Sequence, residues 1–378
     1  MIAAVEAELL KRVRVRGRIS RVELARELNI VPSTAGIYVD RLIRDGFLLE
    51  SSKRESRSGR PPKWLELNSA GGRFVGVDFE ARNLMATAVD FSEKPLRQLH
   101  KGIRTTDTAG HILDKIEQAI AEVMDGDTRA VLGIGVGVPG TIDPRSGVAL
   151  HYEFIKGWHE VPLGARLTKK FGVPVFLENN IRCMALAELW FGSGRGLKDF
   201  VCVGVRSGIG AGVIVEGHLL RGSRNRAGEI GHWQCPATEG SASFEHVASL
   251  SAMIAMAEQA VARGRKTLLS DVKGELSFDD VARAAQQGDA FTQSLIQAVA
   301  RAHGWAINEL NALFDPQKII FAGPLAELGE LFLGPVRDAV KQWNGAAPEV
   351  EITGSTLGKY NGALGAAALA LHQWKPKH

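Results

Sequence analysis

Apolar positions recur at helical spacing three times within the first 46 residues and then at strand spacing twice. Ser20 and Glu23 form the pattern of a capping box at the start of the second helix, and Gly46 ends the third. Two short apolar runs, 47–50 and 64–67, predict the strands of a hairpin. This order predicts a winged helix-turn-helix, whose third helix enters the major groove of DNA. The predicted helices span 5–15, 21–28 and 32–45.

The three predicted helices divide into buried and exposed faces. We expect the buried face to contain Leu9, Leu10, Val13, Val22, Leu24, Ala25, Leu28, Ala35, Val39, Leu42 and Ile43. We expect the exposed face of the third helix to meet DNA through Ser33, Thr34, Gly36, Ile37, Tyr38 and, on phosphate, Arg41. No Arg, Lys, Asn or Gln stands at the first exposed positions, so base reading would rely on hydroxyl and thymine-methyl contacts.

Positive charge is concentrated in the same N-terminal stretch. Residues 1–63 contain 14 Lys and Arg against 8 Asp and Glu, a net charge of +6, and because the whole chain carries +4 the remainder carries −2. Residues 51–63 hold five cations and one anion, and prolines keep the segment G-R-P-P extended. The alternative is a solvent-exposed basic linker that connects the head to the body without binding DNA. We expect instead a DNA-binding wing with the contacts Lys53, Arg54, Arg57 and Arg60.

From residue 71 onward, strand and helix patterns alternate, which predicts an α/β fold. Strands are predicted at 74–78, 84–90, 130–140, 200–205, 213–217 and 318–324, and a helix at 110–124. A chain of 378 residues is too long for one core and predicts two or three domains. The three cysteines form no C-x-x-C pair, and no apolar run reaches about 18 residues, so we expect a cytoplasmic protein without disulfides or a membrane span.

Seven motifs of this body resemble those of the ROK family, which comprises repressors, open reading frames and sugar kinases. They are V-G-V-D at 75–78, G-V-G-V-P-G at 135–140, G-W-x-x-V-P-L at 157–163, E-N-N…A-L-A-E at 178–188, G-I-G-A-G at 208–212, A-G-E-I-G-H at 227–232 and I-I-F-A-G-P at 319–324. The resemblance implies two actin-like (ribonuclease-H-like) α/β domains around a cleft that binds a sugar, with ATP beside it in kinase members. The expected domains are a winged helix-turn-helix at 1–68, a smaller α/β domain at 71–183 with the C-terminal helix 359–378, and a larger one at 184–358.

By this resemblance, a sugar would be held by Gly140, Asn179, Asn180, Glu229, His232 and Glu245. Carboxylates and amides suit a polyol because they accept from, or donate to, neighbouring hydroxyls. Each of these side chains, considered alone, is more often a polar residue that forms structural hydrogen bonds than a ligand contact. Their occurrence together within the motifs favours sugar binding.

Two positions depart from the pattern of the kinase members. Where those enzymes have an aspartate as general base, this chain has Asn180, whose amide accepts no proton at neutral pH. Where they have a phosphate-binding D-x-G-G-T, this chain has D-F-E-A-R at 78–82, in which Glu80 would repel phosphate. The later glycine turn near 208–210 is retained. We therefore expect no kinase activity and no catalytic residue.

This chain also lacks most of the cysteines that form the structural zinc site implied by the family resemblance. Family members follow G-H with a C-x-C-G-x-x-G-C cluster, which together with that histidine binds zinc. After His232, only Cys235 remains of the three cysteines, Ser243 stands at the third position, and the spacing gives His246 little support as a ligand. We expect no structural zinc and no other cofactor.

These patterns together predict a sugar-responsive transcription regulator, in particular a repressor, of carbohydrate-metabolism genes. Its partners would be a double-stranded DNA operator and a sugar or sugar derivative, and paired half-sites imply a homodimer or homotetramer. We expect the segment 64–72 to transmit conformational changes from the body to the head. Two alternatives stay open, namely a sugar kinase with an accessory DNA-binding head and a DNA-binding protein whose body binds no ligand.

Replacing Arg57 and Arg60 together by alanine should weaken DNA binding, because two phosphate-neutralising cations are lost. The measurement is a fluorescence-anisotropy titration of labelled duplex at physiological salt and at two lower salt concentrations. The plot of log affinity against log salt concentration has a negative slope. Its magnitude should decrease by about 2 for two lost phosphate contacts. Unchanged affinity at physiological salt would remove the wing from the binding mechanism.

Overall fold

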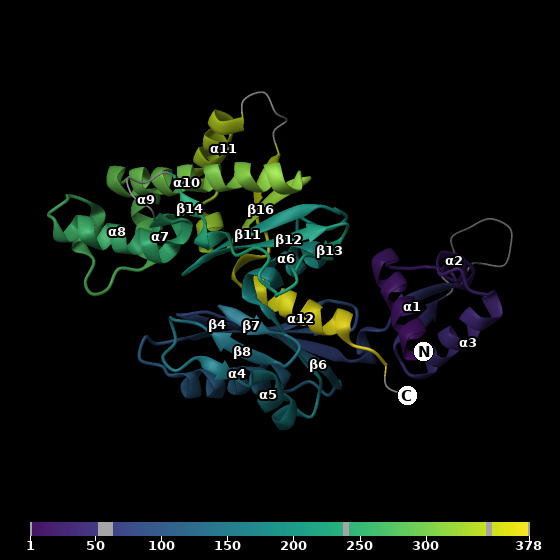
Figure 1. The fold of residues 1–378 in the computed structure, drawn as a ribbon. Coiled ribbons are helices and arrows are strands. Elements are labelled where there is room, and N and C mark those ends of the chain that lie inside the picture. Colours follow the sequence, from purple (N-terminus) through teal and green to yellow (C-terminus); the bar gives the residue numbers. More distant parts are fainter. Residues whose placement is uncertain (1, 52–62, 237–241, 345–349, 377–378) are drawn as a thin grey trace. The chain divides into compact units, whose positions relative to one another are not determined.

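The computed structural model describes residues 2–51, 63–236, 242–344 and 350–376 (Figure 1). Contacts divide the chain into two compact units, which we call unit 1 (Met1–Glu178 with Ala366–His378) and unit 2 (Asn179–Gly365). Unit 1 contains the head, which we define as residues 2–68, and a five-stranded sheet. Unit 2 is built on a second five-stranded sheet.

The head forms the predicted winged helix-turn-helix. Its elements are α1 (Ile2–Arg16), α2 (Arg21–Glu27), α3 (Pro32–Arg44), β1 (Leu48–Ser51) and β2 (Trp64–Leu67), with the strands paired antiparallel. The capping box is confirmed, since Ser20 accepts from the backbone of Glu23 and the Glu23 carboxylate accepts from the backbone of Ser20. The predicted core is confirmed at Leu9, Leu10, Val13, Leu24, Ala25, Ala35, Val39 and Leu42.

Three apolar positions of the head are less buried than predicted. Val22 is 62% exposed, and Leu28 and Ile43 are half-buried. Because residues follow each other at about 100° around a helix, Val22 lies roughly 110° from the centre of the buried stripe of α2. A helix of seven residues has one such stripe, so Val22 faces solvent.

The sheet of unit 1 has the strand order β10-β6-β3-β4-β5. Its strands are β3 (Arg73–Phe79), β4 (Asn83–Asp90), β5 (Pro95–Gly102), β6 (Val131–Val138) and β10 (Val175–Asn179). The strand β3 runs antiparallel to β4 and parallel to β6. Helix α4 (Ala109–Met124) packs across β3, β4 and β5. A small sheet of β7 (Thr141–Asp143), β8 (Val148–His151) and β9 (His159–Val161) precedes α5 (Leu163–Phe171).

The sheet of unit 2 repeats this plan with the order β13-β12-β11-β16-β17. Its strands are β11 (Phe200–Val205), β12 (Ile209–Val215), β13 (His218–Leu219), β16 (Lys318–Ala322) and β17 (Glu351–Gly354). Again the first strand, β11, is antiparallel to the second, β12, and parallel to the next, β16. The predicted α/β fold with two related domains behind a winged helix-turn-helix is therefore confirmed.

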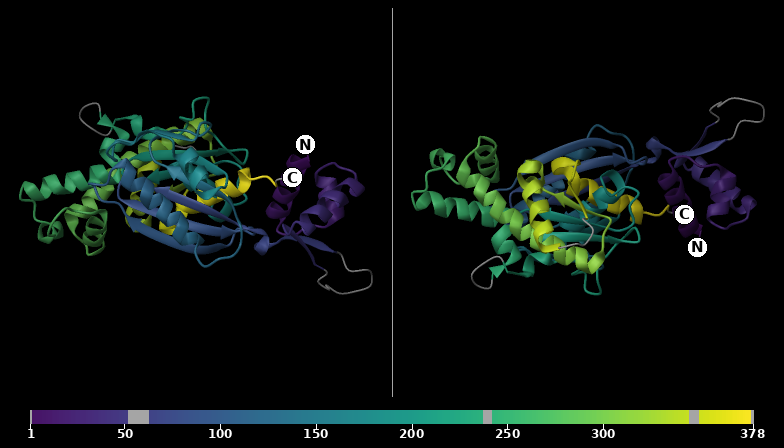
Figure 2. Two further views of the ribbon diagram at one scale, coloured as in Figure 1. Left: turned by 90° about the horizontal axis from the view of Figure 1, so that it is seen from below. Right: turned by 90° about the horizontal axis from the view of Figure 1, so that it is seen from above.

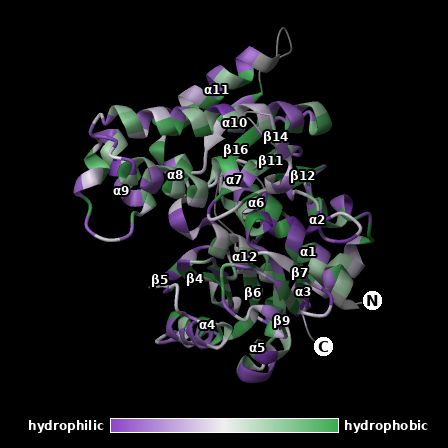
Figure 3. Cartoon of the chain, turned by 60° about the vertical axis from the view of Figure 1, so that its left-hand side comes forward, coloured by the Kyte–Doolittle hydropathy of each residue, from purple (hydrophilic) through white to green (hydrophobic). Residues whose placement is uncertain are grey.

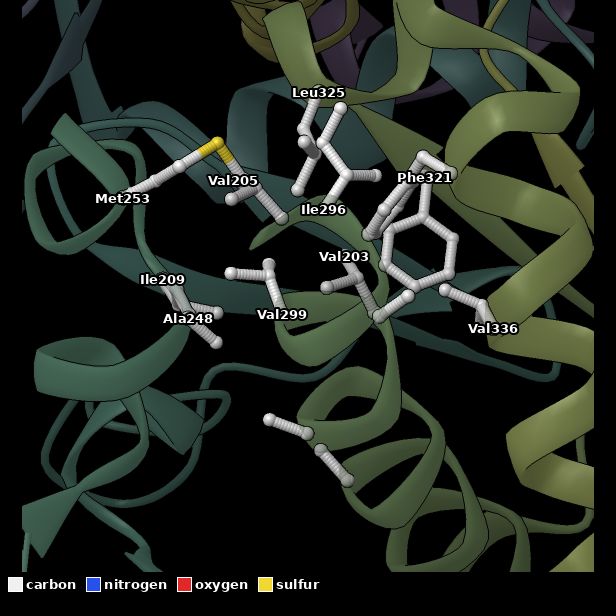
Figure 4. Close-up of a cluster of buried hydrophobic side chains, with 14 of the residues drawn as sticks. Val203, Val205, Ile209, Ala248, Met253, Ile296, Val299, Phe321, Leu325 and Val336 are labelled. Carbon is white, nitrogen blue, oxygen red and sulfur yellow. The ribbon is translucent and has the colours of Figure 1, made fainter. Parts of the chain in front are cut away.

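Helices cover this second sheet and form its core. They are α6 (Asn180–Phe191), α7 (Phe244–Ala248), α8 (Leu250–Ala262), α9 (Phe278–Gln286), α10 (Ala290–Phe314) and α11 (Glu330–Asn344). Figure 4 shows Ile296 and Val299 of α10 beside Val203 and Phe321 of the sheet, and all four are buried in one cluster. In Figure 3 the surrounding helices alternate hydrophobic and hydrophilic positions, as helices with one buried face do.

Strand β12 starts at Ile209, four residues before the predicted start at 213. The prediction took the glycines of G-I-G-A-G as a turn, but Gly210 and Gly212 lie within the strand. A Cβ at Gly212 would lie 2.4 Å from the Cβ of Ala185 on α6. These glycines therefore allow α6 to lie directly on the sheet, which is the other role of glycine in a strand.

Helix α12 (Asn361–Gln373) belongs to both units, because the division by contacts falls inside it, between Gly365 and Ala366. Within unit 2, a Cβ on Gly365 would lie 1.7 Å from the carbonyl oxygen of Cys183. Within unit 1, a Cβ on Gly135 of β6 would lie 1.8 Å from the carbonyl oxygen of Ala366. The helix thus packs against backbone at both places. Its end runs toward the head (Figure 2).

Candidate functional site

The start of α3 presents the surface predicted to bind DNA. Ser33, Thr34 and Ile37 are exposed, and Gly36 and Tyr38 are half-buried. Arg41 lies in an ion pair, with its Nη1 atom 3.2 Å from Oε1 of the fully buried Glu6. The other predicted contacts, Lys53, Arg54, Arg57 and Arg60, lie outside the described residues. The described part of the surface is therefore hydroxyl and apolar.

The β3–β4 turn includes Glu80, the residue expected from the sequence to repel phosphate. The Glu80 backbone N–H donates to the Asn83 carbonyl at 2.9 Å, and the Asn83 amide donates to the Glu80 carboxylate at 3.1 Å. His100 lies 2.8 Å from the Asn83 side-chain oxygen. The turn is thus tied to itself and to β5 by side chains, and it directs a carboxylate rather than an array of glycine N–H groups at any anion nearby.

The junction of β10 and α6 places the two consecutive asparagines. Asn179 is the N-cap of α6, because its Oδ1 accepts from the backbone N–H groups of Ile181 and Arg182 at 3.0 and 3.2 Å. Asn180 is the first residue of the helix and is buried. Capping fixes the amide plane of Asn179 and occupies its oxygen, so hydrogen bonding to a ligand would come from its nitrogen.

Three of the predicted sugar contacts come together in unit 2. His232, in the short helix η2 (Ile230–His232), has Nε2 3.9 Å from Oε2 of Glu229 and Nδ1 3.7 Å from Oε1 of Glu245. Glu245 comes from the first turn of α7. A Cβ on Gly231 would lie 2.9 Å from the Glu245 carboxylate, so the glycine makes room for it. The result is an imidazole between two carboxylates, a set that both donates to and accepts from hydroxyls.

Burial controls the ionisation of Glu229. It raises the pKa of the Glu229 carboxyl above its usual value, against the opposing charges of Arg182, His232 and Arg226. Arg182 is 2% exposed, and its Nη1 donates to the carbonyl oxygen of Asn225 at 2.8 Å. It therefore ties α6 to the loop that carries Glu229. Sequence reasoning missed this residue, although a cation within the apolar run I-R-C-M-A-L-A was the available signal.

Gly140, the remaining predicted contact, lies in unit 1 at the end of β6. Its φ is +71°, and a Cβ there would lie 2.1 Å from the His151 carbonyl oxygen, so only glycine fits. The next residues of that neighbouring segment are aromatic, with Tyr152 and Phe154 ring centroids 5.4 Å apart and Phe154 45% exposed. The exposed ring of Phe154, tilted against the half-buried Tyr152, is a further candidate that the motifs did not indicate.

The segment after His232, where the family resemblance led us to look for zinc ligands, includes the paired strands β14 (Gln234–Cys235) and β15 (Ala242–Ser243). Cys235 is buried, and the Ser243 hydroxyl lies 2.5 Å from Nδ1 of His246. Among the residues that the structure describes, no three His, Cys, Asp or Glu side chains are grouped to hold a metal ion. The absence of a structural zinc stays a prediction.

Within the described ranges, no helix combines the length and the apolar character that crossing a membrane requires.

Comparison with known proteins gives matches for both the head and the body of the chain. A family model described as "ROK family" matches residues 74–373, and one described as "Winged helix-turn-helix DNA-binding" matches residues 8–48. The xylose repressor of Caldicellulosiruptor bescii is 27% identical over 336 residues, which are 86% of this chain and 84% of the repressor.

The similar solved structures include both a transcription regulator and a sugar kinase. A ROK family transcriptional regulator, a homologue of the E. coli MLC protein, matches with a TM-score of 0.82 and 25% identity over 98% of this chain and 96% of its own. A ROK family glucokinase from Streptomyces griseus, in complex with glucose and AMPPNP, matches with a TM-score of 0.72 and 30% identity over 79% of this chain and 99% of its own. The regulator therefore matches nearly the full chain, head included.

Replacing Glu229 by Gln should stabilise the protein at neutral pH. A carboxyl whose pKa is raised in the folded state destabilises that state as pH rises through the raised pKa, and Gln removes this charge. The melting temperature of the variant should exceed that of the parent at pH 7, and the two should converge at acidic pH. Glu258→Gln on the exposed face of α8 is the matched control, with no expected change. A lower melting temperature for Glu229→Gln at pH 7 would contradict this electrostatic picture.

Proposed function

Because this chain belongs to the ROK family and carries a winged helix-turn-helix head, we propose that it is a sugar-responsive transcription regulator without kinase activity. The observation that carries the proposal is a combination of two features. The Glu229–His232–Glu245 cluster offers sugar hydroxyls a complete set of partners. The two positions needed for phosphoryl transfer, Asn180 and the β3–β4 turn, hold unsuitable groups.

The chemistry at Asn180 argues against transfer. Phosphoryl transfer to a sugar hydroxyl needs a group that takes the hydroxyl proton, and a neutral amide does not. Asn180 is also buried within the first turn of α6, where an amide makes hydrogen bonds without a change of charge. The position therefore suits recognition of a hydroxyl rather than its activation.

The β3–β4 turn argues in the same direction from the phosphate side. Nucleotide phosphates are held by backbone N–H groups and cations, whereas this turn carries Glu80 bound by Asn83. Its backbone N–H at Glu80 is already used by the Asn83 carbonyl. A triphosphate would meet a carboxylate at this turn.

The effector would be a pyranose or a closely related polyol. Its hydroxyls would meet Asn179, Glu229, His232 and Glu245, while Arg182 keeps the Glu229 loop against α6. The name of the xylose repressor makes xylose the first candidate.

The remaining properties follow from this function. The head would bind one half-site of a palindromic operator, so the active form would be a homodimer or homotetramer in the cytoplasm. No structural zinc would be needed, because backbone pairing of β14 and β15 holds the hairpin of Cys235. The sugar would act by binding two conformations with unequal affinity, and the operator affinity would change by the same coupling factor.

The test combines two measurements on the full chain. Duplexes selected by the protein from a random pool define the operator, and D-xylose, D-glucose and N-acetyl-D-glucosamine are then titrated by calorimetry. At least one sugar should bind, and the same sugar should change the operator affinity by about 5- to 150-fold, the usual range of allosteric coupling. Operator binding that no sugar in a wider panel alters would instead support a DNA-binding protein whose body binds no ligand.

The kinase alternative has a separate test. The parent protein and the Asn180→Asp variant are assayed for ADP release with the same sugars, ATP and Mg²⁺. Neither should turn over, because the carboxylate introduced by the substitution would restore a base but leave Glu80 at the phosphate turn. ADP release by the parent that depends on a sugar would establish the kinase alternative.

A further inference from the structure

Helix α10 carries a fully buried histidine, His303, within unit 2. The centroid of its ring lies 4.9 Å from that of Phe244 on α7, and all its aromatic contacts are edge-to-face. The rings of Phe321 on β16 and Phe332 on α11 lie 5.5 and 5.4 Å away. A polar ring in such apolar surroundings costs free energy unless its nitrogens are hydrogen-bonded. This residue belongs to none of the motifs and not to the candidate sugar cluster.

The two ring nitrogens of His303 have different surroundings. Nε2 lies 3.2 Å from the carbonyl oxygen of Ala248, and because a carbonyl only accepts, Nε2 carries the hydrogen. Burial lowers the pKa of His303 to about 4, so the ring is neutral at pH 7 and Nδ1 carries no hydrogen. Nδ1 has no hydrogen-bond partner among the residues that the structure describes. The imidazole therefore directs one donor at Ala248 and leaves one acceptor unsatisfied.

The accepting carbonyl belongs to the last residue of α7. This helix ends because Ser249 is extended, with φ −77° and ψ 166°, and α8 starts directly after it. The last carbonyls of a helix have no partner within the helix, so His303 supplies a donor to Ala248. The same ring contacts Phe244, the first residue of α7. One side chain thus contacts both ends of a five-residue helix, whose second residue is Glu245.

Helix α10 is a firm support for this contact. Directly beside His303, a Cβ on Gly304 would lie 2.4 Å from the Cβ of Ala339, so α10 lies directly against α11. Trp305, one residue further, adds a second ring to Phe244, with the centroids 5.9 Å apart. Close-packed interiors resist small displacements, and rigid elements hold functional side chains best. Helix α7 therefore rests on an element that has little freedom to move.

We infer that His303 is a positioning residue for Glu245. By holding both ends of α7, it fixes the place of the Glu245 carboxylate, whose Oε1 lies 3.7 Å from Nδ1 of His232. This inference rests on the proposed function, because there Glu245 and His232 are partners of the sugar hydroxyls. It adds to that site a residue that touches no sugar and acts through Glu245.

The competing arrangement is that backbone hydrogen bonds alone hold α7. The Phe244 N–H donates to the Trp233 carbonyl at 2.7 Å, and the Leu250 N–H, just after α7, donates to the Arg206 carbonyl at 3.0 Å. Neither bond satisfies the carbonyl at the end of α7, to which His303 donates. The two arrangements differ in the effect of removing the imidazole donor.

The first experiment needs neither sugar nor DNA. The imidazole resonances of the full chain, labelled isotopically at histidine, are recorded by NMR, and His232 is assigned from the spectrum of His232→Gln. His303→Leu removes the donor but fits an apolar site, and it should shift the His232 resonances. His303→Gln, whose side-chain nitrogen can replace Nε2 as the donor, should keep them at the parent positions. Ile296→Val, which removes a buried methyl group from α10, is the control that should leave them unchanged.

The second experiment measures by calorimetry the binding of whichever of D-xylose, D-glucose and N-acetyl-D-glucosamine the parent binds. His303→Leu should weaken that binding by about 10- to 100-fold, the effect expected when one hydrogen bond to a charged group is lost. His303→Gln and Ile296→Val should bind the sugar as the parent does.

Each result decides one part of the inference. Unmoved His232 resonances in His303→Leu would overturn the positioning role. Equal shifts in His303→Leu and His303→Gln would assign the effect to packing of the ring and overturn the role of the hydrogen bond. Shifted resonances with unchanged sugar affinity would overturn the link to sugar recognition. If the parent binds no sugar, the proposed function fails, while the resonances still decide whether His303 positions Glu245.

Discussion

Helix α12 lies so close to two backbones that no side chain fits between them. In unit 2 it meets α6 where Gly365 faces the carbonyl of Cys183, and in unit 1 it meets β6 where Gly135 faces the carbonyl of Ala366. Interiors packed at this density do not deform gradually, so elements in such contact move together or not at all. The helix has little room to slide on either partner. Within unit 2, α12 therefore packs directly on the backbone of α6.

Helices α6 and α12 each contact residues near a candidate functional surface. At its start, α6 is capped by Asn179 and, through Arg182, holds the loop of Glu229. At its end, α12 leads to Trp374 and the rings that include Phe47 of the head.

The proposed function distinguishes a sugar sensor from a sugar kinase at two places in the fold. Both need hydroxyl partners, which in the proposed function the cluster of Glu229, His232 and Glu245 would provide. Only the kinase needs a proton acceptor and a cradle for phosphate, and here those places hold Asn180 and the Glu80–Asn83 turn. Relatives of both kinds match this chain at similar identity. Overall sequence identity therefore does not distinguish a regulator from a kinase. The residues at these two positions bear directly on phosphoryl transfer.

The sequence by itself determined most of the architecture. The winged head followed from helical periodicity, the capping box at Ser20 and the stop at Gly46, because these signals are local. The paired domains followed from motifs spread over the body. Local reasoning failed where packing against another element decides the outcome: Val22 faces solvent, and the glycines from 210 to 212 lie in a strand beneath α6. Only the tertiary structure brought Arg182 to the Glu229 loop and Trp374 to Phe47. Those contacts join residues far apart in the chain, and their geometry depends on how separate elements pack, which no local pattern of residue types encodes.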